Sequence, residues 1–283
     1  MKTNMKQKKF LRLLVSYCIL AFMTIIIIYQ LLWTVGASFN PGNSLISTSI
    51  IPSNPTLDHY KELFAGKESL QYANWYMNSL KISIFTMIGT VISVSFTAYA
   101  FSRFRFKGRK NALTVFLLLQ MIPQFSALIA LFVLAQLLGL MNSHWLLILL
   151  YIGGQIPMNT YLMKGYMDSI PMDLDESAKI DGASNTRIFW QILMPLSRPM
   201  IAVVAMNGFT GPLGDFVLSS TILRTPESYT LPIGLYNLVN EVMGASYTTF
   251  AAGAILISIP IAIIFILLQK NFVSGLTAGG TKG

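Results

Sequence analysis

The sequence predicts an all-α, polytopic membrane protein with six transmembrane helices. Of its 283 residues, 54% are hydrophobic and only 11% are charged, and the mean hydropathy is +0.60. This composition is typical of integral membrane proteins. Apolar runs near the ~20 residues that a helix needs to cross a bilayer recur along the chain. The six spans are expected at residues 12–37, 78–101, 111–138, 143–165, 196–222 and 248–270.

The first span follows a basic N-terminus and therefore resembles a secretory signal. Val35-Gly36-Ala37 even matches the small-residue pattern of a cleavage site. However, the apolar run from Leu11 to Val35 is well beyond the length of a signal's apolar region, which is about 7–15 residues. We therefore expect an uncleaved anchor helix.

The distribution of Lys and Arg orients the six spans. With the N-terminus inside the cell, sixteen of the 20 basic residues fall on the cytoplasmic side. The four on the outer side are Lys61, Lys67, Lys81 and Arg224. Because basic residues flank the cytoplasmic ends of membrane spans, both termini are expected in the cytoplasm. Topology thus explains the net charge of +9, and we expect no binding to nucleic acid.

The external loops are expected to be too short for a domain of their own. Residues 38–77 contain a possible short helix at Leu57–Phe64, and residues 139–142 are expected to form a tight turn. Residues 223–247 carry two prolines and several tyrosines, and they either face an external partner or fold back over the pore. His59 and His144 lie far apart without the spacing of metal ligands, so both are interpreted as ordinary loop residues.

Several spans contain residues that allow bending or close helix packing. Prolines fall within four of the six, at Pro123, Pro157, Pro212 and Pro260. Backbone groups that a proline leaves unpaired in a membrane need partners from neighbouring helices or a water-lined cavity. Glycines cluster in the fourth and fifth spans, where they permit either close approach of helices or local unwinding.

Polar residues at membrane depth are candidates for a translocation path. Asp215 is the one acid expected well inside a span, and a buried carboxylate has to face the bundle interior or a wet cavity. Proteins bind sugars through uncharged amides together with an aromatic face. The amides of this chain are expected either to contact a sugar in this way or to hold the helices together. The predicted path residues are Asp215, Asn207, Gln155, Asn159 and Tyr151.

Between the fourth and fifth spans, residues 168–199 are polar in an otherwise apolar chain. They predict two short helices separated by a turn at Gly182, which tolerates backbone conformations that other residues avoid. Pro171 suits the first turn of the first helix, and Ser184 or Asn185 can cap the second.

The second of these helices is predicted to be amphipathic. Its apolar residues Ile188, Phe189, Ile192 and Leu193 fall on one face, and the prolines that follow should end it. We expect this unit to offer an apolar surface to a partner protein.

The same segment carries a family motif. Glu176-Ser177-Ala178 is followed after three residues by Gly182, and after nine more by Ile192 and Met194-Pro195. This resembles the EAA loop of ATP-binding-cassette (ABC) importer permeases of the binding-protein-dependent (MalFG-type) family, with Ser in place of one Ala and Met in place of Leu. The resemblance implies the type I ABC importer transmembrane fold, in which this cytoplasmic loop docks on an ATPase. The ATPase-coupling residues it implies are Glu176, Ser177, Ala178, Asp181, Gly182, Ile192 and Pro195.

The resemblance extends to the C-terminal tail, which is similar to that of the six-span subunit of maltose/maltodextrin and arabinogalactan-oligosaccharide permeases. In that family the tail reaches the ATPases. The tail residues that the resemblance would place at that contact are Thr277, Gly279, Gly280 and Lys282. The resemblance also implies a division of the chain into three parts. These are an anchor helix and external loop at 1–73, a transmembrane type-1 domain at 74–270 containing the coupling loop 168–199, and a cytoplasmic tail at 271–283.

The function implied is the import of oligosaccharides, of maltodextrin or galacto-oligosaccharide type, across a bacterial cell membrane. The family implies a second multispan permease subunit, two ATPase subunits that hold ATP and Mg, an external solute-binding protein and contact with membrane lipid. Two alternatives stay open: a permease for another carbohydrate, such as a sugar alcohol or glycerol phosphate, and an ion-coupled secondary transporter.

The chain carries none of the usual catalytic signatures. Gly66-Lys67 is followed by Glu68 and lacks the glycine that a phosphate-binding loop requires. No H-E-x-x-H motif is present, and Cys18 is the only cysteine, which excludes an internal disulfide and a cysteine-rich metal site. We therefore expect that the chain is not an enzyme and binds no cofactor or metal.

Overall fold

The structure is a computed structural model that describes residues 2–43, 50–65, 71–240 and 246–280. These residues form helices, turns and coil without any strand, which confirms the all-α prediction for the described ranges. The chain divides into two compact units. Unit 1 comprises residues 1–70 and 235–256, and unit 2 comprises residues 71–234 and 257–283.

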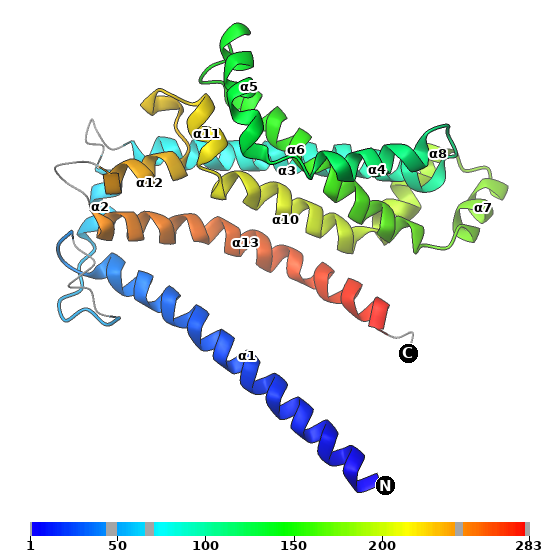
Figure 1. The fold of residues 1–283 in the computed structure, drawn as a ribbon, viewed down its shortest axis with the longest axis horizontal. Helices are drawn as coiled ribbons and strands as arrows, with labels where there is room; N and C mark the ends of the chain where they lie inside the picture. The colour runs from blue at the N-terminus through cyan, green and yellow to red at the C-terminus, as the bar shows by residue number, and fades with distance from the viewer. Residues whose placement is uncertain (1, 44–49, 66–70, 241–245, 281–283) are drawn as a thin grey trace. The chain divides into compact units, whose positions relative to one another are not determined.

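The order of the helices is shown in Figure 1. Unit 1 begins with α1 (Lys2–Phe39) and α2 (Asp58–Phe64), the latter close to the predicted short helix. Unit 2 begins with α3 (Tyr72–Arg103), α4 (Arg109–Leu119), α5 (Gln124–Leu137) and α6 (His144–Asp168). It continues through α7 (Asp173–Ile180), α8 (Asn185–Ile188), a π-helical turn (Phe189–Leu193), α9 (Met194–Leu196), α10 (Arg198–Gly214), α11 (Val217–Ile222) and a 3-10 turn (Pro226–Ser228). Helices α12 (Leu231–Asn240) and α13 (Tyr247–Gly280) contribute residues to both units.

Four of the six predicted spans are continuous helices that are long and apolar enough to cross a membrane. They are Lys8–Phe39, Tyr72–Arg103, His144–Asp168 and Tyr247–Asn271. The other two predicted spans, 111–138 and 196–222, are interrupted near the prolines and glycines that were expected to allow bending or local unwinding.

Proline accounts for the first interruption. Helix α4 ends at Leu119 and α5 begins at Gln124, directly after Pro123. Proline disfavours helical geometry in the residue before it and removes a backbone donor, which favours a helix end at this point. Other prolines, by contrast, lie inside α6, α10 and α13, at Pro157, Pro212 and Pro260. In the fifth predicted span, α10 ends at Gly214, and Asp215 takes an extended conformation with φ −87° and ψ 123°.

Unit 1 is held together by polar contacts around His59, which is buried. Its Nε2 donates to the carbonyl oxygen of Asn40 at 2.9 Å, and its Nδ1 lies 3.2 Å from the Thr249 hydroxyl. The Thr248 hydroxyl donates to the carbonyl oxygen of Gly42 at 2.6 Å. The interpretation of His59 as an ordinary loop residue was therefore wrong, because it joins α2 to the start of α13 within this unit.

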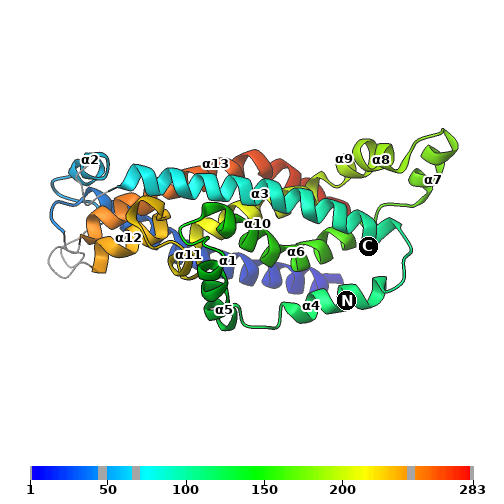
Figure 2. The same cartoon turned by 90° about the horizontal axis from the view of Figure 1, so that it is seen from above.

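In unit 2, α3 packs against α6 and α10 (Figures 1 and 2). Gly208 permits the contact between α3 and α10, since a Cβ there would lie 2.8 Å from the Cα of Met87. The prediction that span-five glycines allow close packing is confirmed at this position. At Gly214, by contrast, a Cβ would meet nothing within 4 Å.

The end of unit 2 opposite α7 (Figure 1) joins two segments that are far apart in sequence. Asn78 donates its amide to the carbonyl oxygens of Glu227 and Tyr229 at 2.9 and 3.0 Å, and the Ser79 hydroxyl accepts from the Leu231 amide at 2.7 Å. His144 also bonds this region, through the carbonyl oxygen of Ser228 at 2.8 Å. His144 is thus the first residue of α6 and a structural contact, not an ordinary loop residue.

Candidate functional site

A cavity of about 670 Å³ in unit 2 contains all five predicted path residues. It lies among α5, α6, α10 and α11, with Gln120 from the turn after α4. Its polar lining consists of Gln120, Tyr151, Gln155, Asn159, Asn207, Thr210 and Asp215, and leucine and methionine side chains provide most of the rest. The structure therefore brings together residues that are spread over nearly a hundred positions. Tyr151, the aromatic residue among those predicted for the path, lines the cavity.

Asp215 lies at the break between α10 and α11. It lines the cavity, and it also stabilises the break. Its carboxylate accepts a hydrogen bond of 2.7 Å from the Tyr151 hydroxyl. It also accepts from the backbone amides of Leu218 and Ser219, at 3.4 and 2.9 Å. These amides begin α11 and have no partner within the helix, so the carboxylate acts as its cap.

The amides on the cavity wall form a chain between α6 and α10. Asn207 donates to the side-chain oxygen of Asn159 at 3.1 Å, and Asn159 donates to the carbonyl oxygen of Gln155 at 2.9 Å. The side-chain oxygen of Gln155 is buried without a hydrogen-bond partner in the described part of the chain. A buried acceptor without a partner is costly, so a group that donates a hydrogen bond is favoured there.

At the other end of unit 2, the predicted coupling loop has the helix–turn–helix form that the sequence indicated. Gly182 has φ +81°, the left-handed region where a side chain is strained. Ser184 caps α8, its hydroxyl accepting from the Arg187 amide at 3.3 Å. Two details differ from the prediction. Pro171 precedes α7, which begins at Asp173, and the second helix runs through Pro195 to Leu196 before the chain bends by 81° into α10.

The apolar face of this second helix is turned into unit 2, so this face is not the apolar surface that the unit was expected to offer to a partner. Ile188, Phe189 and Leu193 are buried in a cluster with α3, α6 and α10. The Phe189 ring stacks on Phe96 at 4.9 Å between centroids. Other apolar residues of the loop are exposed, above all Ile180 at the end of α7, with 87% of its surface exposed.

Arg103 attaches α7 to the membrane helices. Its Nε lies 2.6 Å from a carboxylate oxygen of Asp175, and both side chains are more than nine-tenths buried. Its remaining nitrogens donate to the carbonyl oxygens of Met167 and Ile170 at 3.0 and 3.1 Å, and to the Ser102 hydroxyl at 3.1 Å. One arginine at the end of α3 therefore holds the end of α6, the connecting turn and α7.

Two neighbouring contacts extend this attachment. The Tyr99 hydroxyl donates to the carbonyl oxygen of Asn185 at 3.0 Å, which fixes the start of α8. The Ser102 hydroxyl donates to Asp168 at 2.7 Å, and Lys164 pairs with the same carboxylate at 2.6 Å. We call the set of Tyr99, Ser102, Arg103, Asp168 and Asp175 the anchoring cluster.

The predicted coupling residues divide into an exposed and a packed group around this cluster. Glu176, Ser177, Asp181, Gly182 and Pro195 are exposed. Ala178 and Ile192 pack against the buried cluster of unit 2. Thr277, Gly279 and Gly280 belong to the last turns of α13, where only the backbone is described, and Lys282 lies outside the described residues.

Sequence reasoning did not find the roles of Arg103 and Asp175. Arg103 was one of the sixteen basic residues assigned to the cytoplasmic side, and Asp175 lay within the polar segment 168–199 without a role of its own. The acid next to the motif glutamate was a weak signal. Nothing local in the sequence pairs it with an arginine 72 positions earlier.

Known proteins resemble the chain over its whole length. The family of binding-protein-dependent transport system inner membrane components matches residues 89–277. The galactooligosaccharides transport system permease protein GanQ of Bacillus subtilis (strain 168) is 83% identical over 283 residues, covering all of both chains. The maltodextrin transport system permease protein MdxG of the same organism is 46% identical, covering 99% of this chain and all of its own.

The fold resembles that of a solved transporter. A chain from the crystal structure of a bacterial ABC transporter involved in the import of the acidic polysaccharide alginate superposes with a TM-score of 0.74. The match covers 92% of this chain and 95% of the other, at 20% sequence identity. The architecture is therefore the transmembrane fold of type I ABC importers.

Proposed function

The chain belongs to the family of binding-protein-dependent transport system inner membrane components, and we propose that it is the permease subunit of an ABC importer for galacto-oligosaccharides. The observation that carries the substrate class is the 83% identity, along the full length, to a permease named for these sugars. The multi-pass helical architecture fits a subunit that encloses part of a membrane path.

The polar cavity is the part of this subunit that we assign to the path. A neutral sugar needs donors and acceptors for its hydroxyls and an apolar or aromatic surface for its ring faces. Asn159, Asn207 and Gln155 supply the first, and Tyr151 with the surrounding leucines supplies the second. Asp215 is the acid among the residues that line this cavity, and its carboxylate is already engaged by Tyr151 and two backbone amides. This arrangement favours an uncharged substrate over a cation.

The anchoring cluster is the part that we assign to energy coupling. We propose that ATP and Mg are bound and hydrolysed by two separate ATPase subunits, and that this chain binds no cofactor of its own. A force applied to the exposed residues of α7 passes to α3 and α6, because Arg103 and Asp175 join them through a buried ion pair. The membrane helices then move as one body with the docked loop, as in rigid-body switching of packed elements.

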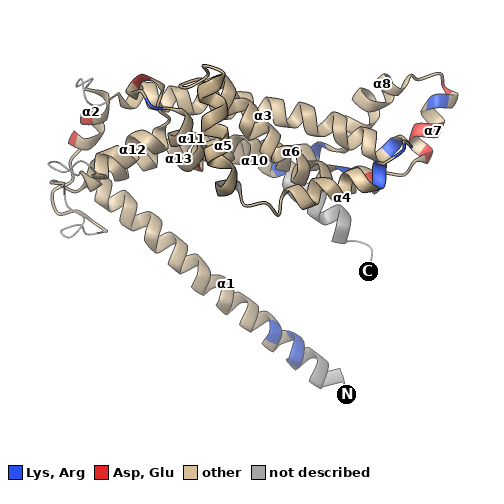
Figure 3. Ribbon diagram, turned by 45° about the horizontal axis from the view of Figure 1, so that its top comes forward, with Lys and Arg blue, Asp and Glu red and all other residues tan. Residues whose placement is uncertain are grey.

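Membership of the family supports the remaining partners, and the distribution of basic residues supports the topology. We propose a second, unlike permease subunit and an external solute-binding protein that delivers the sugar, in a bacterial cell membrane with both termini of this chain in the cytoplasm. Figure 3 shows that most Lys and Arg residues of unit 2 lie at the end that carries α7, which supports a cytoplasmic position for that end.

The test measures uptake of labelled galacto-oligosaccharides in a strain that lacks this chain. Uptake is compared between cells that carry the wild-type gene and cells that carry a null allele. Restored uptake of galacto-oligosaccharides, abolished when the partner ATPase lacks its phosphate-loop lysine, supports the proposal. Complementation that restores only maltodextrin uptake favours the second candidate, a maltodextrin permease, which the 46% identity to MdxG supports. Restoration of neither contradicts the assignment to oligosaccharides.

A further inference from the structure

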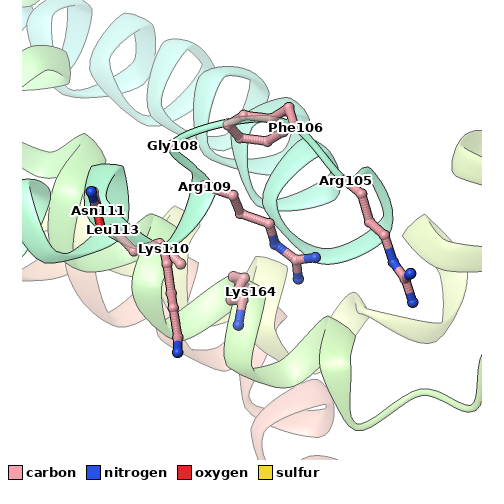
Figure 4. Close-up of a pocket in the computed structure, with 8 residues that line it drawn as sticks. All are labelled: Arg105, Phe106, Gly108, Arg109, Lys110, Asn111, Leu113 and Lys164. Carbon is pink, nitrogen blue, oxygen red and sulfur yellow. The ribbon is translucent and has the colours of Figure 1, made fainter.

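A second cavity, of about 610 Å³, lies at the end of unit 2 that carries α7, and it is lined by cations (Figure 4). Its lining residues come from the turn between α3 and α4, the first turns of α4, and α6. They are Arg105, Phe106, Gly108, Arg109, Lys110, Asn111, Leu113 and Lys164. Four of the eight are basic and none is acidic, so the cavity concentrates positive charge.

Little within the protein neutralises this charge. Lys164 pairs with Asp168, and Arg109 donates to the carbonyl oxygen of Ser102 at 3.3 Å. Arg105 and Lys110 are exposed, and their side chains make no hydrogen bond or ion pair to any residue that the structure describes. In Figure 4 the four basic side chains extend toward the same side. Cations gathered on one cavity repel one another, and a bound anion removes that repulsion.

The start of α4 adds a second, independent attraction for an anion. Gly108 occupies the N-cap position with φ +87° and has no side chain to cap the helix. Among the described backbone bonds, the amides of Lys110 and Asn111 have no acceptor. Free amides at a helix N-terminus, together with the helix dipole, form a favourable site for phosphate.

The surroundings point to a membrane lipid as the source of the phosphate. Helix α4 has no buried residue, and Val115, Leu118 and Leu119 are each about half exposed, beyond the basic turns and in a predicted span. Phe106, on the cavity wall, is also exposed. A ligand with a phosphate at one end and acyl chains at the other matches this order of basic and apolar surfaces. Basic pockets at the cytoplasmic ends of membrane helices suit anionic headgroups.

We propose that this cavity binds the headgroup of an anionic phospholipid from the cytoplasmic leaflet. Arg105 and Lys110 contact the phosphate, the free amides of α4 donate hydrogen bonds to a second phosphate oxygen, and the acyl chains lie along α4. Arg109 and Lys164, held by their internal bonds, line the cavity and contribute charge. The site is separate from the path cavity and does not depend on which sugar is imported.

The experiment measures lipid retention by the full transporter complex, purified with mild delipidation and analysed by native mass spectrometry. Wild-type complex in vesicles of phosphatidylcholine with phosphatidylglycerol should retain phosphatidylglycerol on this subunit. Each basic residue near an anionic surface contributes roughly a fivefold effect on affinity, so K110Q should bind about fivefold and R105Q/K110Q about 30-fold more weakly. The matched control is K107Q, which removes the same charge from the same turn but does not line the cavity. It should change retention clearly less than K110Q does, because Lys107 does not line the cavity and salt screens exposed charges outside the site.

Three results would overturn the proposal. Equal losses in K110Q and K107Q would show that only general surface charge attracts the lipid. Displacement of the lipid by millimolar inorganic phosphate alone would assign the cavity to a soluble phosphate. Unchanged lipid retention in R105Q/K110Q together with loss of the ATPase subunits would make the cavity a protein-docking surface. Because the readout is lipid retention, a failure to import galacto-oligosaccharides would bear on the proposed function and not on this site.

Discussion

Arg103 at the end of α3 and Asp175 in α7 form an ion pair of 2.6 Å that is almost completely buried. The second oxygen of Asp175 is buried without a partner among the described residues, so the pair depends on the arginine alone. Removing one member of a buried pair leaves an uncompensated charge and costs about 3–5 kcal/mol.

The first prediction follows from this pair. R103M should leave the protein inserted in the membrane but detach α7, with loss of uptake and weaker retention of the ATPase on purification. D175N should behave similarly, whereas D173N, on the exposed side of the same helix, should retain near-normal uptake. In R103M/D175L the buried charge is gone from both sides, so its thermal stability should exceed that of R103M. Normal uptake in R103M and D175N would show that the ion pair plays no part in coupling.

The second prediction concerns Gly182, whose φ of +81° lies in the left-handed region. G182V should misdirect α8 because a β-branched residue is strained there, at a cost of about 1–2 kcal/mol or more. G182N is the matched control, since asparagine tolerates this conformation better than other residues with a side chain. Uptake should fall sharply in G182V and much less in G182N. Equal uptake in the two variants would contradict a conformational role for the glycine.

The third prediction concerns Glu176, which is exposed beside the anchoring cluster. E176K should preserve folding and pairing with the sister permease, because the side chain is not needed inside this subunit. It should lower ATPase retention and the stimulation of ATP hydrolysis by sugar-loaded binding protein. D173K, the same charge reversal one turn earlier on α7, is the control. If both reversals leave retention and stimulation at wild-type levels, Glu176 does not contact the ATPase.

The fourth prediction concerns Asp215 at the break after α10. D215L removes the acceptor for the Tyr151 hydroxyl and for two amides of α11, and each unpaired buried group costs about 1–3 kcal/mol. Uptake should therefore fall at least about tenfold, while the amount of protein in the membrane falls less. D215N keeps one oxygen acceptor and should be intermediate, and Y151F should show how much of the effect passes through the tyrosine. Wild-type uptake by D215L would limit Asp215 to a tolerated polar residue.

The fifth prediction concerns topology, which the uneven distribution of basic residues indicates. Reporter fusions after Lys110 and after Lys164 should read as cytoplasmic, and fusions near Pro55 and Glu227 as external. The measurement uses a pair of reporters that are active on opposite sides of the membrane. A cytoplasmic reading at Pro55 would move α7 to the wrong side for an ATPase.

The sequence by itself determined the fold class and the family. Composition and long apolar runs are properties of the linear sequence, so they identified a helical membrane protein without knowledge of any tertiary contact. The coupling motif was visible for the same reason, because a helix–glycine–helix unit uses local signals such as the cap at Ser184 and the turn at Gly182. The path residues could be proposed because Asp215 is unusual at membrane depth.

Tertiary structure decided which faces are buried and which distant residues meet. An amphipathic helix has an apolar face whether that face binds a partner or its own chain, so periodicity could not place Ile188 and Phe189 inside unit 2. Breaks in the predicted spans at Pro123 and Gly214 depend on whether neighbouring groups can satisfy the freed backbone. The meeting of Arg103 with Asp175 arises from the packing of α3 against α6, since pairing between residues so far apart in sequence leaves no local pattern.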